Sequence, residues 1–151
     1  MDDVTDAQIQ KSLNTELNRT QVFKAKESAG KSGSFFFFSY DKKFLIKTMN
    51  DRELAVFLDA LPTYLYHLKK YPASLIARIY GIFTVRMENI VPVHLLLMAN
   101  SAQVGGPVEF CFDLKGSIIN REVKKSEITK GGTLKDVNLQ DLVKDEVFLL
   151  F

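Results

Sequence analysis

The sequence has little cysteine, no tryptophan and no long apolar run. Its one cysteine, Cys111, excludes an internal disulfide and a zinc cluster, and it suits a reducing compartment. In its apolar surroundings we expect Cys111 to be a plain packing residue. No stretch approaches the roughly 20 apolar residues of a membrane-spanning helix, and the acidic, polar first ten residues lack the pattern of a signal peptide. We therefore expect a cytoplasmic protein, either soluble or peripheral to a membrane.

A strong excess of one charge is also missing. The formal net charge is +2 and no run of lysine or arginine stands out, which argues against nucleic acid as a partner. Apolar residues make up 46% of the 151 residues, enough to bury a core and to exclude global disorder. This length predicts one domain or one lobe of a larger one.

The coarse pattern mixes short strands with helices. Residues 1–20 are polar, with a short helix expected over 7–18. An apolar stripe at helical spacing begins with a capping box, in which Asn50 and Glu53 start a helix at Asp51. Pro62 interrupts this stripe, and we place it in the first turn of a second helix that runs to Lys70. Strands are expected in residues 21–26, 35–40, 44–47, 74–87, 91–98 and 108–112, with an antiparallel pair formed by 74–87 and 91–98 and charged turns over 120–138.

The stretch from Gly30 to Met49 carries the strongest chemical signal. The sequence GKSGS over residues 30–34 contains two glycines, which allow the backbone to turn sharply and to approach a ligand closely. Two strands follow, and Lys47 lies near the end of the second. A lysine on an apolar strand behind a glycine-bearing turn is how kinases place a cation on nucleotide phosphates. A plain hairpin turn is the competing interpretation.

Two further features of this stretch have alternatives. A phosphate-binding loop of the Walker type is excluded, because Ala25 stands where that motif has its first glycine and four phenylalanines follow in place of a helix. Glu53 has two interpretations. It is either the helix carboxylate that pairs with the strand lysine of a kinase or a capping residue alone, and local physics favours the cap.

Four segments in order resemble the phosphatidylinositol phosphate kinase family: SGSFFFFSYDKKFLIKTM, LPTYLYHLKKYPASLIARIYGIFTV, VPVHLLLMAN and FDLKGSIINRE. The resemblance extends from about Leu13 to Leu142. Its most specific parts are the Asp113–Ser117 motif, with Arg121 four residues after the serine, and the Gly/Ser–Phe run that leads to Lys47.

The resemblance implies an α+β fold, with a protein-kinase-like N-terminal lobe of antiparallel strands and covering helices, followed by the start of a second lobe. It implies ATP with Mg²⁺ as the nucleotide and a phosphatidylinositol phosphate in membranes as the lipid substrate. By similarity, Leu97–Asn100 is the hinge between lobes, and Arg121 belongs to the site or to the phosphorylated lipid. The residues implied at the nucleotide are Gly30, Lys31, Ser32, Gly33, Ser34, Lys47, Met98, Asn100, Asp113 and Lys115.

The chain also departs from the family. The family's catalytic aspartate lies in a segment like MDYSL and its metal-binding aspartate in one like IID, and neither string occurs here. Asp136, Asp141 and Asp145 lie in no matching motif, so none is assigned. We expect residues 21–151 to be a kinase domain truncated on its C-terminal side, inactive alone and prone to self-association through its apolar surface. The alternative is a non-catalytic scaffold module that binds a nucleotide or a phosphoinositide.

Overall fold

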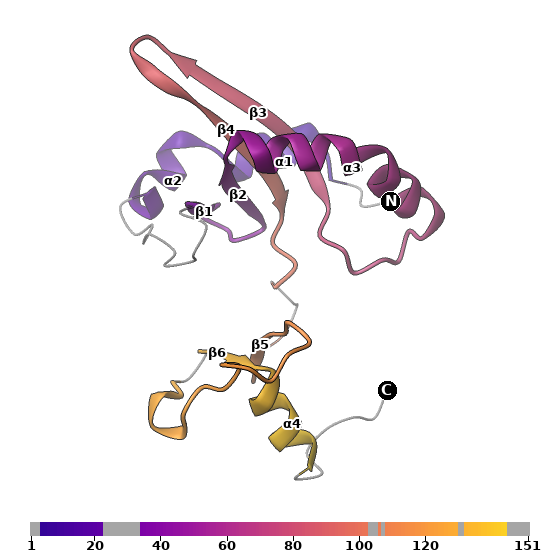
Figure 1. Ribbon diagram of the computed structural model, residues 1–151. Coiled ribbons are helices and arrows are strands. Elements are labelled where there is room, and N and C mark those ends of the chain that lie inside the picture. Colours follow the sequence, from indigo (N-terminus) through magenta and orange to yellow (C-terminus); the bar gives the residue numbers. More distant parts are fainter. Residues whose placement is uncertain (1–3, 23–33, 103–105, 107, 130–131, 145–151) are drawn as a thin grey trace. The chain divides into compact units, whose positions relative to one another are not determined.

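The computed structural model has the α+β fold that the resemblance implies, with a four-stranded antiparallel sheet and helices. It describes residues 4–22, 34–102, 106, 108–129 and 132–144. The chain divides into two units, residues 1–103 and 104–151. The first unit contains the sheet and the long helix, and the second contains the Asp113–Ser117 motif (Figure 1).

The sheet of the first unit has the strand order β1-β2-β4-β3. Its strands are β1 (Phe36–Phe38), β2 (Phe44–Met49), β3 (Ile79–Met87) and β4 (Ile90–Ala99), and all neighbours are antiparallel. Of the residues in β4, only 94–99 pair with β2. The rest of β4 pairs with β3 alone, so these two strands continue as a hairpin beyond β2 (Figure 1). The predicted antiparallel pair is confirmed, although β3 begins five residues later than expected.

Alternation along β2 divides its side chains between the two faces of the sheet. Lys47 and Met49 lie on one face with their partners Leu96 and His94, whereas Phe44 and Ile46 lie on the other. Phe44 is 3% exposed, and its ring meets that of Tyr80 edge-on, with centroids 5.4 Å apart. Both faces therefore bury apolar side chains around β2 and the second half of β4.

Helix α3 spans Asp51–Lys70 and starts where the capping box predicts. The Asn50 side chain accepts a hydrogen bond from the Glu53 backbone N–H at 2.8 Å, and Glu53 accepts one from the Asn50 N–H at 3.0 Å. The expected break at Pro62 is wrong, because the helix continues through it. Pro62 is exposed, and the half-buried stripe formed by Leu54, Phe57, Leu61, Tyr64 and Leu68 passes behind it. Packing of that stripe outweighs the hydrogen bond that proline removes.

The predicted helix over 7–18 is two helices, α1 (Asp6–Ser12) and α2 (Thr15–Val22). The Asn14 side chain accepts hydrogen bonds from the backbone N–H groups of Glu16 and Leu17, so it caps the second helix and breaks the first. The expected strand over 21–26 is wrong at its start, because residues 21 and 22 are helical, and residues 23–26 lie outside the described part of the chain.

The second unit contains a parallel pair of short strands, β5 (Cys111–Asp113) and β6 (Thr133–Lys135). A 3₁₀ turn, η1 (Lys125–Glu127), lies between them, and α4 (Asp136–Lys144) follows β6 directly. The expected strand over 108–112 is thus later and shorter, and the expected charged turns over 120–138 include a strand and a helix start. Cys111 is exposed rather than a packing residue.

Candidate functional site

Lys47 and Glu53 form an ion pair between the sheet and the long helix. Lys47 comes from β2 and Glu53 from the first turn of α3, and the Lys47 Nζ lies 2.7 Å from the Glu53 Oε1. The two side chains are 24% and 30% exposed. The pair exists because only one residue, Asn50, separates the end of β2 from the start of α3, which turns the first helical turn back over the strand.

Glu53 satisfies both of its interpretations at once. One carboxylate oxygen accepts the capping hydrogen bond from the Asn50 N–H, and the other accepts from Lys47. The hydrogen bond from Lys47, followed by that from Asn50, lowers the pKa of Glu53 below its ordinary value. The carboxylate therefore stays ionised and orients the ammonium group of Lys47.

A hollow of about 260 Å³ lies beside Glu53. It is lined by Ser34 and Phe35, by Thr48 and Met49 at the end of β2, by Asn50 and Glu53 at the start of α3, and by Val93. The structure therefore brings Ser34, the last residue of the expected glycine turn, to the same cavity as Glu53. Gly30, Lys31, Ser32 and Gly33 lie outside the described residues.

A row of hydrogen-bonded side chains also attaches the start of α3 to the hairpin of β3 and β4. His94 Nε2 lies 2.8 Å from Asp51 Oδ1, and His94 Nδ1 lies 2.9 Å from Thr84 Oγ1. The imidazole thus bridges the first residue of α3 and the middle of β3. In its second half, α3 is attached by the Tyr64 hydroxyl, which donates to the Ala77 carbonyl and accepts from the Ile79 N–H.

The expected hinge residues lie at the end of β4. Met98 is in the strand, opposite Leu45. The Asn100 backbone N–H donates to the Lys43 carbonyl at 2.9 Å, and its side-chain amide donates to the Lys42 carbonyl at 2.7 Å. Asn100 therefore fastens the end of β4 to the turn between β1 and β2.

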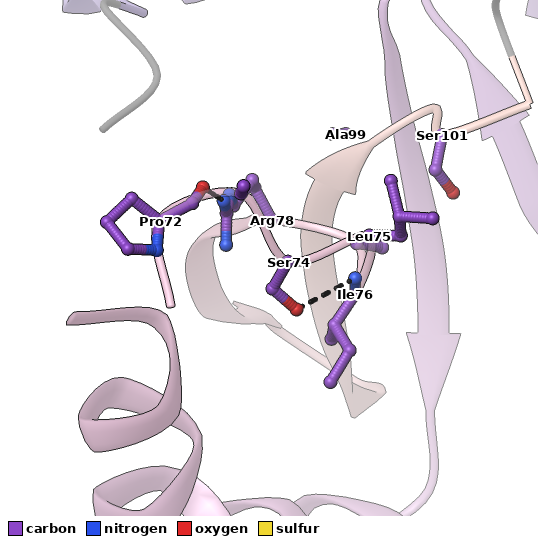
Figure 2. A pocket seen from close by; sticks show the side chains of 9 residues that line it. Pro72, Ser74, Leu75, Ile76, Arg78, Ala99 and Ser101 are labelled. Carbon is purple, nitrogen blue, oxygen red and sulfur yellow. Dashed lines mark hydrogen bonds between the residues drawn. The ribbon is translucent and has the colours of Figure 1, made fainter. Parts of the chain in front are cut away.

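A second hollow, of about 340 Å³, is lined by residues 72–78 after α3 and by Ala99 and Ser101 beyond the end of β4 (Figure 2). Within it, the Ser74 Oγ accepts a hydrogen bond from the Ile76 N–H at 3.3 Å. Arg78 supplies the only charge of this lining, and its guanidinium donates to the Pro72 carbonyl. We assign no ligand to this hollow.

The second unit holds a separate charged cluster around the Asp113–Ser117 motif. Asp113 Oδ1 lies 2.8 Å from Lys115 Nζ, and the two side chains are 45% and 62% exposed. The hydrogen bond from Lys115 is the main cause that lowers the pKa of Asp113. Arg121 donates through Nε to Asp136 Oδ2 at 2.8 Å and through Nη2 to the Asp113 carbonyl, and its side chain is 15% exposed.

Asp136 is the part of this cluster that the sequence did not assign. It is 8% exposed at the start of α4, and its Oδ1 accepts hydrogen bonds from the backbone N–H groups of Lys115 and Gly116. Nearby, Asn138 accepts from the Val123 and Lys135 N–H groups and donates to the Val123 carbonyl. An available signal was the spacing Asp136-Val137-Asn138 after two glycines, which is typical of a helix start.

Among the histidine, cysteine, aspartate and glutamate side chains of the described residues, no group of three or more is arranged to hold a metal ion. None of the helices in the described ranges combines the length and the apolar character that crossing a bilayer requires.

Comparison with known proteins gives one consistent family. The model of the family described as phosphatidylinositol-4-phosphate 5-kinase matches residues 17–149. A probable phosphatidylinositol phosphate kinase of Dictyostelium discoideum is 35% identical over 90% of this chain and 19% of its own length. Phosphatidylinositol 4-phosphate 5-kinase 9 of Arabidopsis thaliana is 38% identical over 74% of the chain and 14% of its own length. Phosphatidylinositol 4-phosphate 5-kinase its3 of Schizosaccharomyces pombe is 34% identical over 81% and 17%. The chain thus spans less than a fifth of the length of these relatives.

Proposed function

Because the chain belongs to the phosphatidylinositol-4-phosphate 5-kinase family, we propose that it is part of a lipid kinase. The reaction proposed is transfer of the ATP γ-phosphate to an inositol-ring hydroxyl of a phosphatidylinositol phosphate at the cytosolic face of a membrane. In this proposal, residues 21–151 belong to the kinase domain and residues 1–20 are a polar helical segment before it. The observation that carries the proposal is the Lys47–Glu53 ion pair.

The pair suits phosphate binding for a physical reason. An ammonium group has three N–H donors, and Glu53 accepts from Lys47 through one carboxylate oxygen. The remaining donors can bind phosphate oxygens without loss of the ion pair. Glu53 is itself held by the Asn50 N–H, so the ammonium group is positioned before the nucleotide arrives. Positioning and neutralisation of charge are most of what a kinase supplies to phosphoryl transfer.

The other nucleotide contacts are proposed from the family resemblance. Residues 30–34 would cover the phosphates, in line with the cavity that Ser34 and Glu53 share. Met98 and Asn100 would contact the adenine. The Asn100 side chain also holds the end of β4 in place through its hydrogen bond to the Lys42 carbonyl. Asp113 and Lys115 are exposed enough to reach a ligand in the second unit.

Mg²⁺ enters this proposal only as the partner of ATP in the substrate. The described residues do not fit a metal site of their own, because they offer no group of three or more ligands. The carboxylate of Asp113 is already paired with Lys115 and Arg121. We therefore assign no metal ligand among the described residues.

The test is binding of MgATP to the 151-residue chain by isothermal titration calorimetry, together with lipid kinase activity of a chimaera. In the chimaera, the chain replaces the matching segment of the Arabidopsis thaliana relative. Lys47→Ala should abolish detectable binding and nearly all turnover. Lys43→Ala is the matched control, because Lys43 lies on the preceding turn and is 65% exposed.

Three outcomes are informative. Loss confined to Lys47→Ala supports the kinase proposal. Comparable loss in Lys43→Ala contradicts the assignment of Lys47. MgATP binding that depends on Lys47, combined with a chimaera that transfers no phosphate to lipid, would favour the non-catalytic scaffold.

A further inference from the structure

The carboxylate of Asp136 lies at the centre of the hydrogen bonds that shape the Asp113–Ser117 turn. Its Oδ1 accepts from the backbone N–H groups of Lys115 at 2.9 Å and Gly116 at 2.8 Å, with the Ser117 N–H at 3.4 Å. Its Oδ2 accepts from Arg121 Nε at 2.8 Å. One buried side chain therefore collects three successive amides and a guanidinium.

Three successive amides that converge on one point form the kind of concave site in which proteins bind anions. Gly116 makes this convergence possible, because its φ of +67° lies in the region that favours glycine. A phosphate is the ligand that such a turn in a kinase would be expected to receive. Here an internal carboxylate occupies the amides instead.

Displacement of this carboxylate by a phosphate would break its hydrogen bonds to the amides and to Arg121. The hydrogen bond from Arg121 is the largest cause that lowers the pKa of Asp136 far below its ordinary value, so the group is ionised at any physiological pH. A phosphate that displaced it would leave a buried carboxylate without its donors, which is costly.

Arg121 carries the effect of Asp136 to Asp113. Its guanidinium binds Asp136 through Nε and reaches Asp113 through Nη2, which lies 3.4 Å from Asp113 Oδ2 and also donates to the Asp113 carbonyl. Asp136 thus fixes Asp113 through Arg121, and fixes Lys115 through the backbone amides. These two side chains are the exposed members of the cluster.

We propose that Asp136 is the positioning residue of the Asp113–Ser117 turn. Its carboxylate fills the amide site, so that the turn presents the side chains of Asp113 and Lys115 to the ligand and not its backbone amides. Arg121 is the bridge between Asp136 and Asp113 rather than a contact to the lipid. The part that concerns the ligand rests on the proposed nucleotide function, whereas the part that concerns the turn does not.

The first measurement is amide hydrogen exchange of residues 115–117 in the ¹⁵N-labelled full chain by NMR. Asp136→Ala should speed this exchange by about tenfold or more, because the amides lose their acceptor. Asp141→Asn is the matched control on the same helix, because Asp141 is 57% exposed and pairs only with Lys144 at 3.5 Å among the described residues. It should leave the exchange unchanged.

Anion rescue separates a filled amide site from general loss of structure. Formate should restore slow exchange of amides 115–117 in Asp136→Ala, because it replaces the missing carboxylate, and should have no such effect on the wild-type chain. Arg121→Gln should shift the resonances of Asp113 while amides 115–117 keep their acceptor. Failure of formate to protect these amides, at concentrations where Asp136→Ala remains folded, overturns the proposal.

MgATP titration then tests the ligand part. MgATP should shift the side-chain resonances of Asp113 and Lys115 in the wild-type chain, and Asp136→Ala should bind it at least about tenfold more weakly, with recovery in formate. Tighter binding by Asp136→Ala, with new protection of amides 115–117, would mean that the amides receive phosphate and would overturn the proposal. If the wild-type chain binds no MgATP while formate rescue succeeds, the positioning of the turn stands and the nucleotide function fails.

Discussion

Glu53 offers a test that separates helix capping from nucleotide binding. Asn50→Ala removes the cap but leaves the carboxylate of Glu53 facing Lys47. Glu53→Gln keeps an oxygen that can accept from the Asn50 N–H but removes the charge that pairs with Lys47. Asn50→Ala therefore removes the side-chain cap on the Glu53 backbone N–H, whereas Glu53→Gln removes the ion pair with Lys47.

The two variants should cost similar stability. Loss of an asparagine cap costs about 1 kcal/mol. A partly exposed ion pair is worth up to about 1 kcal/mol after screening by solvent and salt, and these side chains are 24% and 30% exposed. For a chain of about 150 residues, a loss of 1 kcal/mol lowers Tm by roughly 2 to 4 °C. Thermal unfolding followed by circular dichroism should show this shift for both variants.

Affinity for MgATP should distinguish Asn50→Ala from Glu53→Gln, although the two variants are expected to lose similar stability. Glu53→Gln releases the ammonium group of Lys47 from its fixed position, and we expect about tenfold weaker binding, equivalent to about 1.4 kcal/mol. Asn50→Ala should bind MgATP within a factor of about two of the wild-type chain. Calorimetry at matched fractions of folded protein measures the difference. Equal weakening in both variants, or full affinity in Glu53→Gln, would refute the argument that the ion pair positions Lys47.

Further predictions concern the fold and its response to acid. Phe44→Ala should lower the free energy of unfolding by about 3 to 5 kcal/mol, because the ring is 3% exposed and packs on Tyr80, whereas Phe38→Ala at a half-exposed ring should cost much less; urea unfolding measures both. Pro62→Ala should raise Tm, since an exposed proline inside α3 removes one backbone hydrogen bond. The pKa values of Glu53 and Asp136 are lowered in the folded chain. Their contribution to stability is therefore complete above their unfolded pKa values near 4 and is lost as the pH falls below them. A Tm that stays constant from pH 6 to pH 3 would contradict this. The chain alone should self-associate through its exposed apolar side chains, which size-exclusion chromatography with light scattering would detect and a stable monomer would contradict.

The first unit was largely predictable because its signals are local. Aromatic strands bounded by turn residues, and a capping box read from Asn50 and Glu53, define β1, β2 and the start of α3 without knowledge of the rest of the fold. One error was local, because the Asn14 cap breaks the helix expected over 7–18. Another arose where a distant contact decides. Pro62 remains inside a helix because the packed stripe behind it continues, and this packing is a tertiary effect that proline's local preference does not reveal.

The second unit was harder to predict for the same reason. Strands β5 and β6 are three residues each and pair in parallel across about twenty intervening residues, so neither carries a periodic signal of useful length. Asp136 forms its hydrogen bonds with residues 15 to 21 positions away. Its role is defined by those contacts and not by its neighbours, and the sequence offered only the pattern of a helix start.

The two charged clusters share one physical arrangement but differ in what they leave available. In each, a carboxylate in the first turn of a helix accepts from a cation and from backbone N–H groups, one for Glu53 and several for Asp136. The amides offset the cost of burying the carboxylate, and the ionised carboxylate then fixes the cation. Among the described residues, Lys47 is paired with one carboxylate, whereas Arg121 is paired with two and is less exposed. This difference supports both proposals, in which Lys47 receives a phosphate and Arg121 holds the turn.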